Sequence, residues 1–202
     1  MKVERITLGP AATNVWFVEN EETAEVILTD PADAPDRIIR YVRERGLRPC
    51  GILLTHGHFD HILAVEECRR HFGIPVYANE AELALLQDVQ ANLSAPWVNR
   101  PTRVQPDVLL RDGEEFTLGG FSVRMIATPG HTAGSCCYYF EKEQVLLSGD
   151  TLFAGSCGRT DLPTGSTAAI VASIRDRLFV LPPNTRVYPG HGDITTIAFE
   201  QC

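Results

Sequence analysis

The sequence GILLTHGHFDHI, residues 51 to 62, joins an apolar run directly to three histidines and an aspartate. The whole chain contains six histidines, so half of them lie in this one segment. A solvated polar loop would explain the polarity of the segment but not its spacing. The apolar residues indicate a strand, and the histidines and aspartate that follow it indicate a site at the end of that strand.

Four segments share this construction, in which an apolar run ends at a glycine turn that carries His or Asp: LLTHGH (53–58), IATPGH (126–131), LLSGDT (146–151) and VYPGHG (187–192). Glycine allows the backbone angles of a tight turn and the close approach of chains. If the four strand ends lie side by side, we expect their polar residues to form one cluster: His56, His58, Asp60, His61, His131, Asp150 and His191. The remaining histidine, His71, is expected near a helix C-terminus, where its partial positive charge is favourable.

The rest of the chain alternates strand-like and helix-like segments. Strands are expected at 2–8, 14–20, 24–30, 50–55, 74–79, 114–118, 121–128, 136–142, 144–150 and 185–190. Helices are expected at 34–46, 61–73, 80–89 and 166–181, and the Pro, Asn and Ser content of 91–106 predicts a long loop. Two such halves indicate an α+β protein whose sheets are covered by helices on their outer faces.

Composition narrows the class of protein. The chain has 202 residues, of which 44% are hydrophobic and 22% charged, and no apolar run approaches the roughly 20 residues of a membrane span. The net charge of -8 disfavours nucleic acid, whose phosphates need clustered Lys and Arg. The N-terminus lacks the apolar core of a secretory signal, and six scattered cysteines indicate free thiols in a reducing compartment. We therefore expect one cytoplasmic domain over 1–202 without a membrane or nucleic-acid partner, and the oligomeric state stays open.

Seven clustered His and Asp residues are what two neighbouring metal ions would require. Imidazole and carboxylate suit zinc, iron or manganese, and the absence of thiolate at the turns disfavours a closed structural zinc site. His56 and His58 are two residues apart, so they project to one side of an extended chain. Asp60 and His61 can turn toward a second ion, and the carboxylate of Asp150 can bridge the two.

The pattern HxHxDH at residues 56–61, followed by His131, Asp150 and His191, resembles the metallo-β-lactamase superfamily over nearly the whole chain. The resemblance implies a four-layer αβ/βα sandwich with two divalent metals, expected to be zinc, with iron or manganese as alternatives, at one edge between the sheets. It implies one metal on His56, His58 and His131, a second on Asp60, His61 and His191, and Asp150 as the bridge. Asp30 would support these ligands from behind and fix the orientation of an imidazole.

The flanking segments GPAATNVWFVE, TPGHTAGS, SGDTLFAGSCGRTDLPTGS and VYPGHGDITTI resemble glyoxalase II, especially its small single-domain relatives. The resemblance implies a thioesterase for small acyl thioesters such as S-lactoylglutathione, with attack by metal-bound hydroxide and with Asp60 or a water handling the remaining proton. The chain ends at residue 202, soon after His191, so we expect it to lack the C-terminal helical domain with which full-length glyoxalase II helps to hold glutathione.

Two other functions remain open. The segment GSCGRTDLP also resembles the persulfide dioxygenases, which use a single iron held by two histidines and an aspartate, here His56, His131 and Asp150. A metal-binding protein without catalysis is the third possibility, although ligands at strand-end loops should leave positions for water.

Three further residues have two interpretations each. Arg159 could bind a substrate carboxylate, or it could hold its own loop through Asp161. Trp97 could cover the pocket as a lid, or it could pack in a minor hydrophobic cluster, which is the favoured interpretation. Cys157 could be a redox-sensitive thiol, or it could be a small packed residue, which is again favoured.

Overall fold

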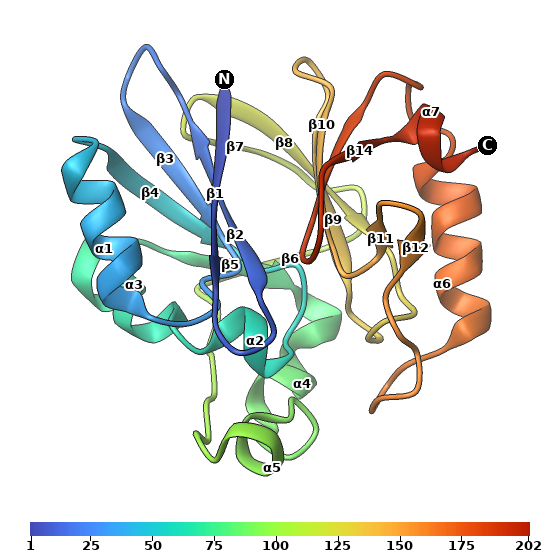
Figure 1. Ribbon diagram of the computed structural model, residues 1–202, viewed down its shortest axis with the longest axis horizontal. Helices are drawn as coiled ribbons and strands as arrows, with labels where there is room; N and C mark the ends of the chain where they lie inside the picture. Colours follow the sequence, from blue (N-terminus) through green and yellow to red (C-terminus); the bar gives the residue numbers. More distant parts are fainter.

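The computed structural model describes residues 1–202 and contains two six-stranded sheets that face each other, with helices on both outer sides (Figure 1). The first sheet lies on the left in Figure 1, and its spatial order follows the chain. Its strands are β1 (Lys2–Leu8), β2 (Thr13–Glu19), β3 (Glu25–Thr29), β4 (Arg48–Leu53), β5 (Val76–Asn79) and β6 (Val108–Leu110). β1, β2 and β3 pair antiparallel, and β3 to β6 pair parallel.

The second sheet has the order β14-β13-β10-β9-β8-β7, and all its neighbours are antiparallel except β10 and β13. Its strands are β7 (Glu115–Leu118), β8 (Phe121–Ala127), β9 (Cys136–Phe140), β10 (Val145–Gly149), β13 (Arg186–Pro189) and β14 (Thr195–Thr196). A separate short hairpin is formed by β11 (Leu152–Phe153) and β12 (Ser156–Cys157).

The helices lie outside the sheets or at the edge where the strands end. Outside the first sheet are α1 (Pro35–Glu44) and α3 (Val65–Phe72), and outside the second is α6 (Thr167–Ser173), which continues as a π-helical turn, η2 (Ile174–Leu178). The remaining short helices are α2 (Phe59–Ile62), η1 (Glu80–Glu82), α4 (Leu83–Gln87), α5 (Ser94–Val98) and α7 (Ile197–Glu200).

Three hydrophobic clusters fill the spaces between four layers. Because successive side chains of a strand point to opposite faces, β2 sends Val15 and Phe17 toward α1 and α3, and Trp16 and Val18 toward the second sheet. A third cluster joins the outer face of the second sheet to η2 and α7 and includes Tyr139. The four-layer αβ/βα sandwich expected from the sequence is therefore confirmed.

Strand direction brings the predicted turns to one edge. β3, β4 and β5 are parallel, so their C-terminal ends meet on one side of the first sheet. In the second sheet β8, β10 and β13 run in a common direction, since β9 pairs antiparallel with both β8 and β10, and β13 is parallel to β10. Both sets of ends lie at the edge that carries α2 (Figure 1).

Some elements differ from the sequence-based expectation. The helix expected at 61–73 is interrupted, because the backbone of Ala64 is not helical and its N–H donates to the carbonyl of Pro31 at 3.0 Å. The loop expected at 91–106 contains α5, which is bounded by Leu93 and Asn99 with left-handed backbone. The strand β6 was not expected. The order of the long elements is otherwise as expected.

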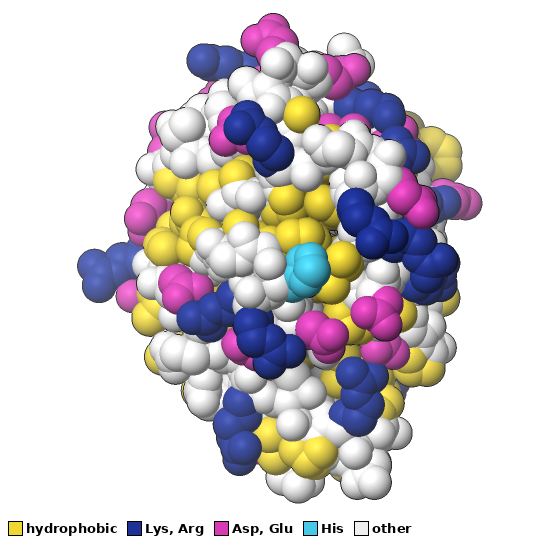
Figure 2. Space-filling model, turned by 90° about the vertical axis from the view of Figure 1, so that its left-hand side faces the viewer, with side chains coloured by type: hydrophobic (Ala, Val, Ile, Leu, Met, Phe, Trp, Pro, Cys, Tyr) yellow, Lys and Arg dark blue, Asp and Glu magenta, His cyan; other side chains and the backbone are white.

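The outer surface of the first sheet is covered by α1 and α3, and Figure 2 shows this side of the molecule. Lys and Arg side chains are interspersed there with Asp and Glu side chains. His71 lies in the last turn of α3, as expected, and is exposed. None of the helices is long and apolar enough to cross a membrane, and all six cysteines are free.

Candidate metal centre

The structure brings all seven His and Asp residues singled out in the sequence into one cluster at the edge where the strands end. They come from both sheets: His56 and His58 from the loop after β4, Asp60 and His61 from α2, His131 from the loop after β8, Asp150 from the end of β10, and His191 from the end of β13. Three groups within this cluster have candidate ligand atoms within 4.8 Å of one another: His56, His58 and His131; Asp60, His61 and His191; and a group that overlaps both, His56, His61 and Asp150.

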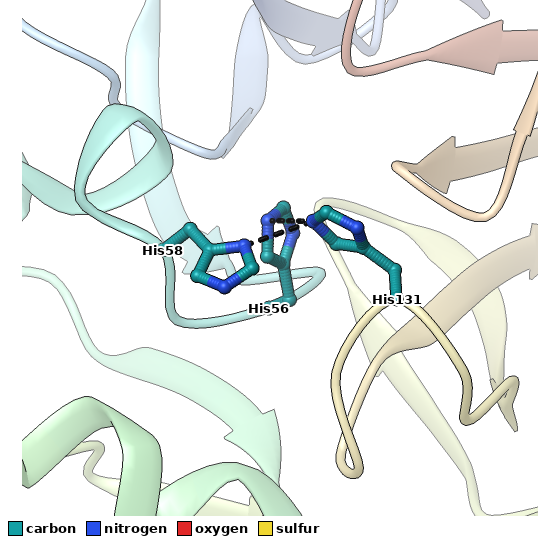
Figure 3. Close-up of side chains that lie close together, drawn as sticks. All are labelled: His56, His58 and His131. Carbon is teal, nitrogen blue, oxygen red and sulfur yellow. Dashed lines mark hydrogen bonds between the residues drawn. The ribbon is translucent and has the colours of Figure 1, made fainter. Parts of the chain in front are cut away.

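The first group consists of His56, His58 and His131, whose rings converge in Figure 3. Nε2 of His131 lies 2.9 Å from Nδ1 of His58 and 3.2 Å from Nε2 of His56. Burial lowers the pKa of all three imidazoles, that of His58 to about 3. All three rings are therefore neutral near pH 7, as metal ligation requires.

The tautomer of His131 follows from its second ring nitrogen. Nδ1 of His131 lies 2.7 Å from the carbonyl oxygen of Arg159, which can only accept a hydrogen bond. Nδ1 therefore carries the proton in the neutral ring, and the lone pair of Nε2 points at His56 and His58. Such a contact fixes both the orientation of the ring and the nitrogen that is free to bind a metal.

The second group consists of Asp60, His61 and His191. Oδ2 of Asp60 lies 3.5 Å from Nε2 of His61 and 3.3 Å from Nε2 of His191. Asp150 lies between the two groups, with Oδ1 3.4 Å from Nε2 of His61, and Oδ2 3.4 Å from Nε2 of His191 and 3.6 Å from Nε2 of His131. Its carboxylate therefore contacts a histidine of each group.

The charges of this second region differ from those of the first. Burial alone would lower the pKa of His61, but the carboxylates of Asp150, Asp60 and Asp30 raise it well above its usual value. Burial opposes the ionisation of Asp150 as well, but His61 and His191 hold its pKa well below the usual range. The region concentrates negative charge that the protein balances with protons on histidine.

The residues present fit a divalent cation. Nε2 of His61 and Oδ1 of Asp150 are both buried without a hydrogen-bond partner, and an unpaired buried polar atom is costly. Both atoms face the cluster, so a bound cation would satisfy them and replace the protons. Imidazole and carboxylate donors without thiolate suit zinc, iron or manganese.

Asp30 holds the cluster from the first sheet. Its Oδ2 accepts hydrogen bonds from Nδ1 of His61 at 2.9 Å and from the hydroxyl of Thr55 at 2.7 Å, and its Oδ1 accepts one from the amide of Thr55 at 2.8 Å. The hydroxyl of Thr55 also lies 3.1 Å from Nδ1 of His56. The carboxylate of Asp30 thus contacts both His61 and the residue that precedes His56.

Two threonines at the site were not identified from the sequence. Thr55 directly precedes the HxHxDH pattern, and this adjacency was the available signal. Thr13, whose hydroxyl donates to Oδ2 of Asp60 at 3.0 Å, lies 47 residues away in the chain and has no such signal.

The two sheets approach closely at the site. A Cβ on Gly149, whose φ is +50°, would lie only 2.3 Å from the hydroxyl oxygen of Thr55. The amide of Cys136 donates to the carbonyl of Thr55 at 2.9 Å, and that of Asn14 donates to the carbonyl of Gly190 at 2.7 Å. These contacts between the sheets keep the turns that carry the clustered His and Asp residues close together.

A cavity of about 290 Å³ opens onto the cluster and is lined by His58, Asp60, His131, Asp150 and His191. Its other walls are largely apolar and comprise Ala11, Phe59, Leu93, Trp97, Phe153 and Leu162. Arg159 is the only Lys or Arg among the lining residues. A small molecule in this cavity would contact the polar cluster on one side and apolar side chains on the others.

The structure distinguishes the interpretations of three lining or nearby residues. The guanidinium of Arg159 makes a bidentate pair with Asp161, with both N–O distances 2.7 Å. Trp97 is 51% exposed and lines the cavity beside Phe59, so the favoured interpretation of a packed cluster residue is wrong. Cys157 is exposed on the short β11–β12 hairpin, so the favoured packed position is wrong there too.

Two relatives of known sequence are both named as hydrolases. The chain is 38% identical to the Bacillus subtilis (strain 168) protein named probable metallo-hydrolase YqgX, over all of this chain and 95% of that one. It is 31% identical to the Haemophilus influenzae (strain ATCC 51907 / DSM 11121 / KW20 / Rd) hydroxyacylglutathione hydrolase GloC, over all of this chain and 95% of that one.

Solved structures with the same fold cover nearly the whole chain. The crystal structure of the B3 metallo-beta-lactamase BLEG-1 matches with a TM-score of 0.94 and 42% identity, over 99% of this chain and 96% of that one. TTHA1623, solved in a di-iron-bound form, matches with a TM-score of 0.86 and 38% identity, over 98% of this chain and 96% of that one.

The family model described as the metallo-beta-lactamase superfamily matches residues 8–191, a range that contains all seven clustered His and Asp residues. The two facing sheets with outer helices and the His/Asp cluster at their common edge agree with this match. The chain therefore belongs to the metallo-beta-lactamase superfamily, with a His/Asp cluster suited to divalent metal ions.

Proposed function

We propose that this protein is a dinuclear metal-dependent thioesterase that hydrolyses small acyl thioesters. The observation that carries the proposal is the joining of two His/Asp groups through Asp150 at the floor of a largely apolar cavity. Hydrolysis of S-lactoylglutathione or a related acyl thiol is supported by the glyoxalase II-like segments and by the likeness to GloC.

We assign the first ion to His56, His58 and His131, the second to Asp60, His61 and His191, and the bridge to Asp150. When bound, two cations lower the pKa of water toward neutrality and polarise a carbonyl group, which supplies both the nucleophile and the electrophile of an acyl transfer. Zinc, iron and manganese all fit this donor set.

Other side chains that line the cavity would handle the proton and position the substrate. Asp60 lines the cavity, and the hydrogen bond that it accepts from Thr13 at 3.0 Å holds its carboxylate in place, where Asp60 or a water would handle the remaining proton. Phe59, Trp97 and Phe153 form apolar walls that would position the acyl group and exclude water. A thiolate leaving group needs little protonation, which suits a site with no free lysine or tyrosine in its lining.

Metal stoichiometry tests the dinuclear arrangement. The wild type should bind two ions per chain when saturated, His58→Ala should lose the first ion, and His191→Ala should lose the second. The control is His71→Ala, which removes the one histidine outside the cluster and should leave two ions. Elemental analysis that finds one ion per chain under saturating metal, with both cluster variants unchanged, would contradict the proposal.

A substrate panel tests the reaction. The metal-loaded wild type should release free thiol from acyl thioesters, Asp60→Ala should abolish this release, and the iron-loaded wild type should consume no oxygen with glutathione persulfide. Brisk oxygen uptake that survives Asp60→Ala, without any thioester cleavage, would instead favour the dioxygenase with iron on His56, His131 and Asp150. Metal binding without either activity would favour the third possibility, a metal-binding protein without catalysis.

The likeness to BLEG-1 favours β-lactam hydrolysis as a second candidate, because that protein is named a B3 metallo-beta-lactamase and is 42% identical. An amide carbonyl of a β-lactam ring could be attacked at the same site. A chromogenic cephalosporin in the same panel separates the two reactions, since thiol release and ring opening are followed at different wavelengths. The thioesterase proposal expects a higher kcat/KM for a thioester than for the cephalosporin.

A further inference from the structure

Glu82 is a buried acidic residue whose carboxylate is not one of the seven clustered groups. It ends the short helix η1, which follows β5, and its side chain is only 2% exposed. The sequence placed it in an ordinary helical segment, EAELALLQDV, and gave it no role. Burying a carboxylate is costly unless hydrogen bonds compensate for the lost water.

The carboxylate accepts three hydrogen bonds from the two loops that carry the first histidine group. Oε1 accepts from the amide of Gly57 at 2.7 Å and from the hydroxyl of Thr132 at 2.8 Å. Oε2 accepts from the amide of Gly134 at 2.9 Å. Gly57 lies between His56 and His58, and Thr132 directly follows His131, so one side chain joins both loops.

Neighbouring residues of the same segment reinforce this contact. Asn79 starts η1 by accepting from the amide of Ala81, and its side-chain amide donates to the carbonyl of Gly134 at 2.9 Å. A Cβ at Gly134 would lie 2.3 Å from the backbone nitrogen of Glu82, so only glycine allows η1 to approach this closely. Both polar backbone groups of Gly134 are therefore held by the segment 79–82.

The three hydrogen bonds favour the ionised carboxylate, because all three partners donate and an ionised carboxylate only accepts. Burial raises the pKa of Glu82 to about 7, and the hydrogen bonds from Gly57, Thr132 and Gly134 act against this shift. Burial of this carboxylate costs free energy, and it lies between the two histidine loops. Such a group is expected where the spacing of the loops matters.

We propose that Glu82 is a positioning residue that joins the His56–His58 loop to the His131 loop and thereby sets the spacing of the three imidazoles for one metal ion. This inference rests on the proposed metal site. Partners that lie behind metal ligands typically contribute about 10–100-fold to metal affinity, and Glu82 acts through the backbone, so an effect near tenfold is expected.

Glu82→Gln tests the proposal with little change in shape. Glutamine presents one acceptor oxygen and one NH2 group, so it cannot accept hydrogen bonds from Gly57 and Gly134 at once. The matched control is Glu80→Gln, which removes the same charge from the same helix at an exposed position that pairs with Arg111. Both changes are placed in the His191→Ala background, where the ion held by the first group is measured alone.

Zinc affinity, from competition with a chromogenic chelator, should fall about tenfold in Glu82→Gln and stay constant in Glu80→Gln. The absorption spectrum of bound Co²⁺ should also change in Glu82→Gln alone, because its bands report ligand geometry rather than stability. In the His58→Ala background, which should already have lost the first ion, Glu82→Gln should leave the affinity for the remaining ion unchanged, because Glu82 contacts only the loops of the first group.

Equal zinc affinity and an unchanged cobalt spectrum in Glu82→Gln would overturn the inference while leaving the metal site intact. Absence of metal binding in the wild type would instead overturn the proposed function. Should Glu82→Gln fail to fold, Thr132→Val removes one of the three hydrogen bonds at nearly constant shape. It should weaken zinc binding by a few-fold with an altered cobalt spectrum, and wild-type values for both would again overturn the inference.

Discussion

At the scale of single residues, the only Lys or Arg side chain that lines the cavity, that of Arg159, is already paired with a carboxylate. Arg159 lines the cavity, and both oxygens of Asp161 lie 2.7 Å from its guanidinium nitrogens. The hydrogen bond from Arg159 also lowers the pKa of Asp161 to about 2, so the pair is ionised near neutral pH. An anionic substrate would therefore compete with Asp161 for the guanidinium, whereas a neutral acyl thioester would not.

Asp161→Asn should lower KM for thioesters that carry a carboxylate by about two- to fivefold, the size expected of an exposed ion pair. KM for neutral thioesters should stay unchanged, and adding Arg159→Ala should reverse the gain. The control is Asp176→Asn, which breaks the similar bidentate pair of Asp176 with Arg175, residues that do not line the cavity. An equal change of KM for charged and neutral thioesters would refute this role of Asp161.

At the scale of elements, α5 supplies an exposed part of the cavity wall. Trp97 lies on this short helix, packs edge-on against Phe59 at a ring-centroid distance of 5.7 Å, and lies 6.0 Å from the guanidinium carbon of Arg159. Leu93, which precedes the helix, lines the same cavity. The helix thus presents an apolar surface to the cavity that opens onto the His/Asp cluster, rather than filling one of the three cores.

Trp97→Ala should raise KM for thioesters with an apolar acyl group by roughly two- to tenfold, in line with the contact energy of a large aromatic side chain. The value of kcat should change little, because Trp97 belongs to none of the three candidate metal-binding groups. Phe199→Ala, which removes a comparably exposed aromatic on α7, should leave KM unchanged. Steady-state kinetics with acyl chains of increasing length measure the effect, and equal KM values for the two variants would argue against a substrate contact.

At the scale of the whole molecule, the His/Asp cluster joins two sheets that are formed by different halves of the chain. Asp30, His56, His58, Asp60 and His61 come from the first-sheet half, and His131, Asp150 and His191 from the second. Without a cation, the carboxylates of Asp60 and Asp150 are balanced only by protonated histidines. A bound metal ion should therefore stabilise the contact between the two halves.

Removal of metal by a chelator should lower the thermal midpoint of unfolding by about 5–10 °C. A ligand present at 100 times its Kd stabilises by about 2.7 kcal/mol, and 1 kcal/mol corresponds to roughly 2–4 °C in a chain of this size. Differential scanning calorimetry before and after re-addition of zinc measures the shift. The shift should persist in His71→Ala and shrink in His191→Ala. A thermal midpoint that does not depend on metal in the wild type would contradict the prediction.

The sequence by itself predicted the alternation of strands and helices, the two covered sheets, and the seven His and Asp residues as one cluster, because periodicity and glycine turns are local patterns. Their roles as ligands stay predictions. For Arg159 the sequence left two interpretations open, and the structure shows the pair with Asp161. Only the tertiary structure placed Thr13 beside Asp60 and brought Glu82 between the two histidine loops. Such contacts join residues with no common local pattern, and they depend on which strand ends meet. The parallel pairing of β3, β4 and β5 determines which strand ends meet, because parallel strands end on the same side of the sheet. It therefore puts Asp30, His56 and Glu82 at one edge.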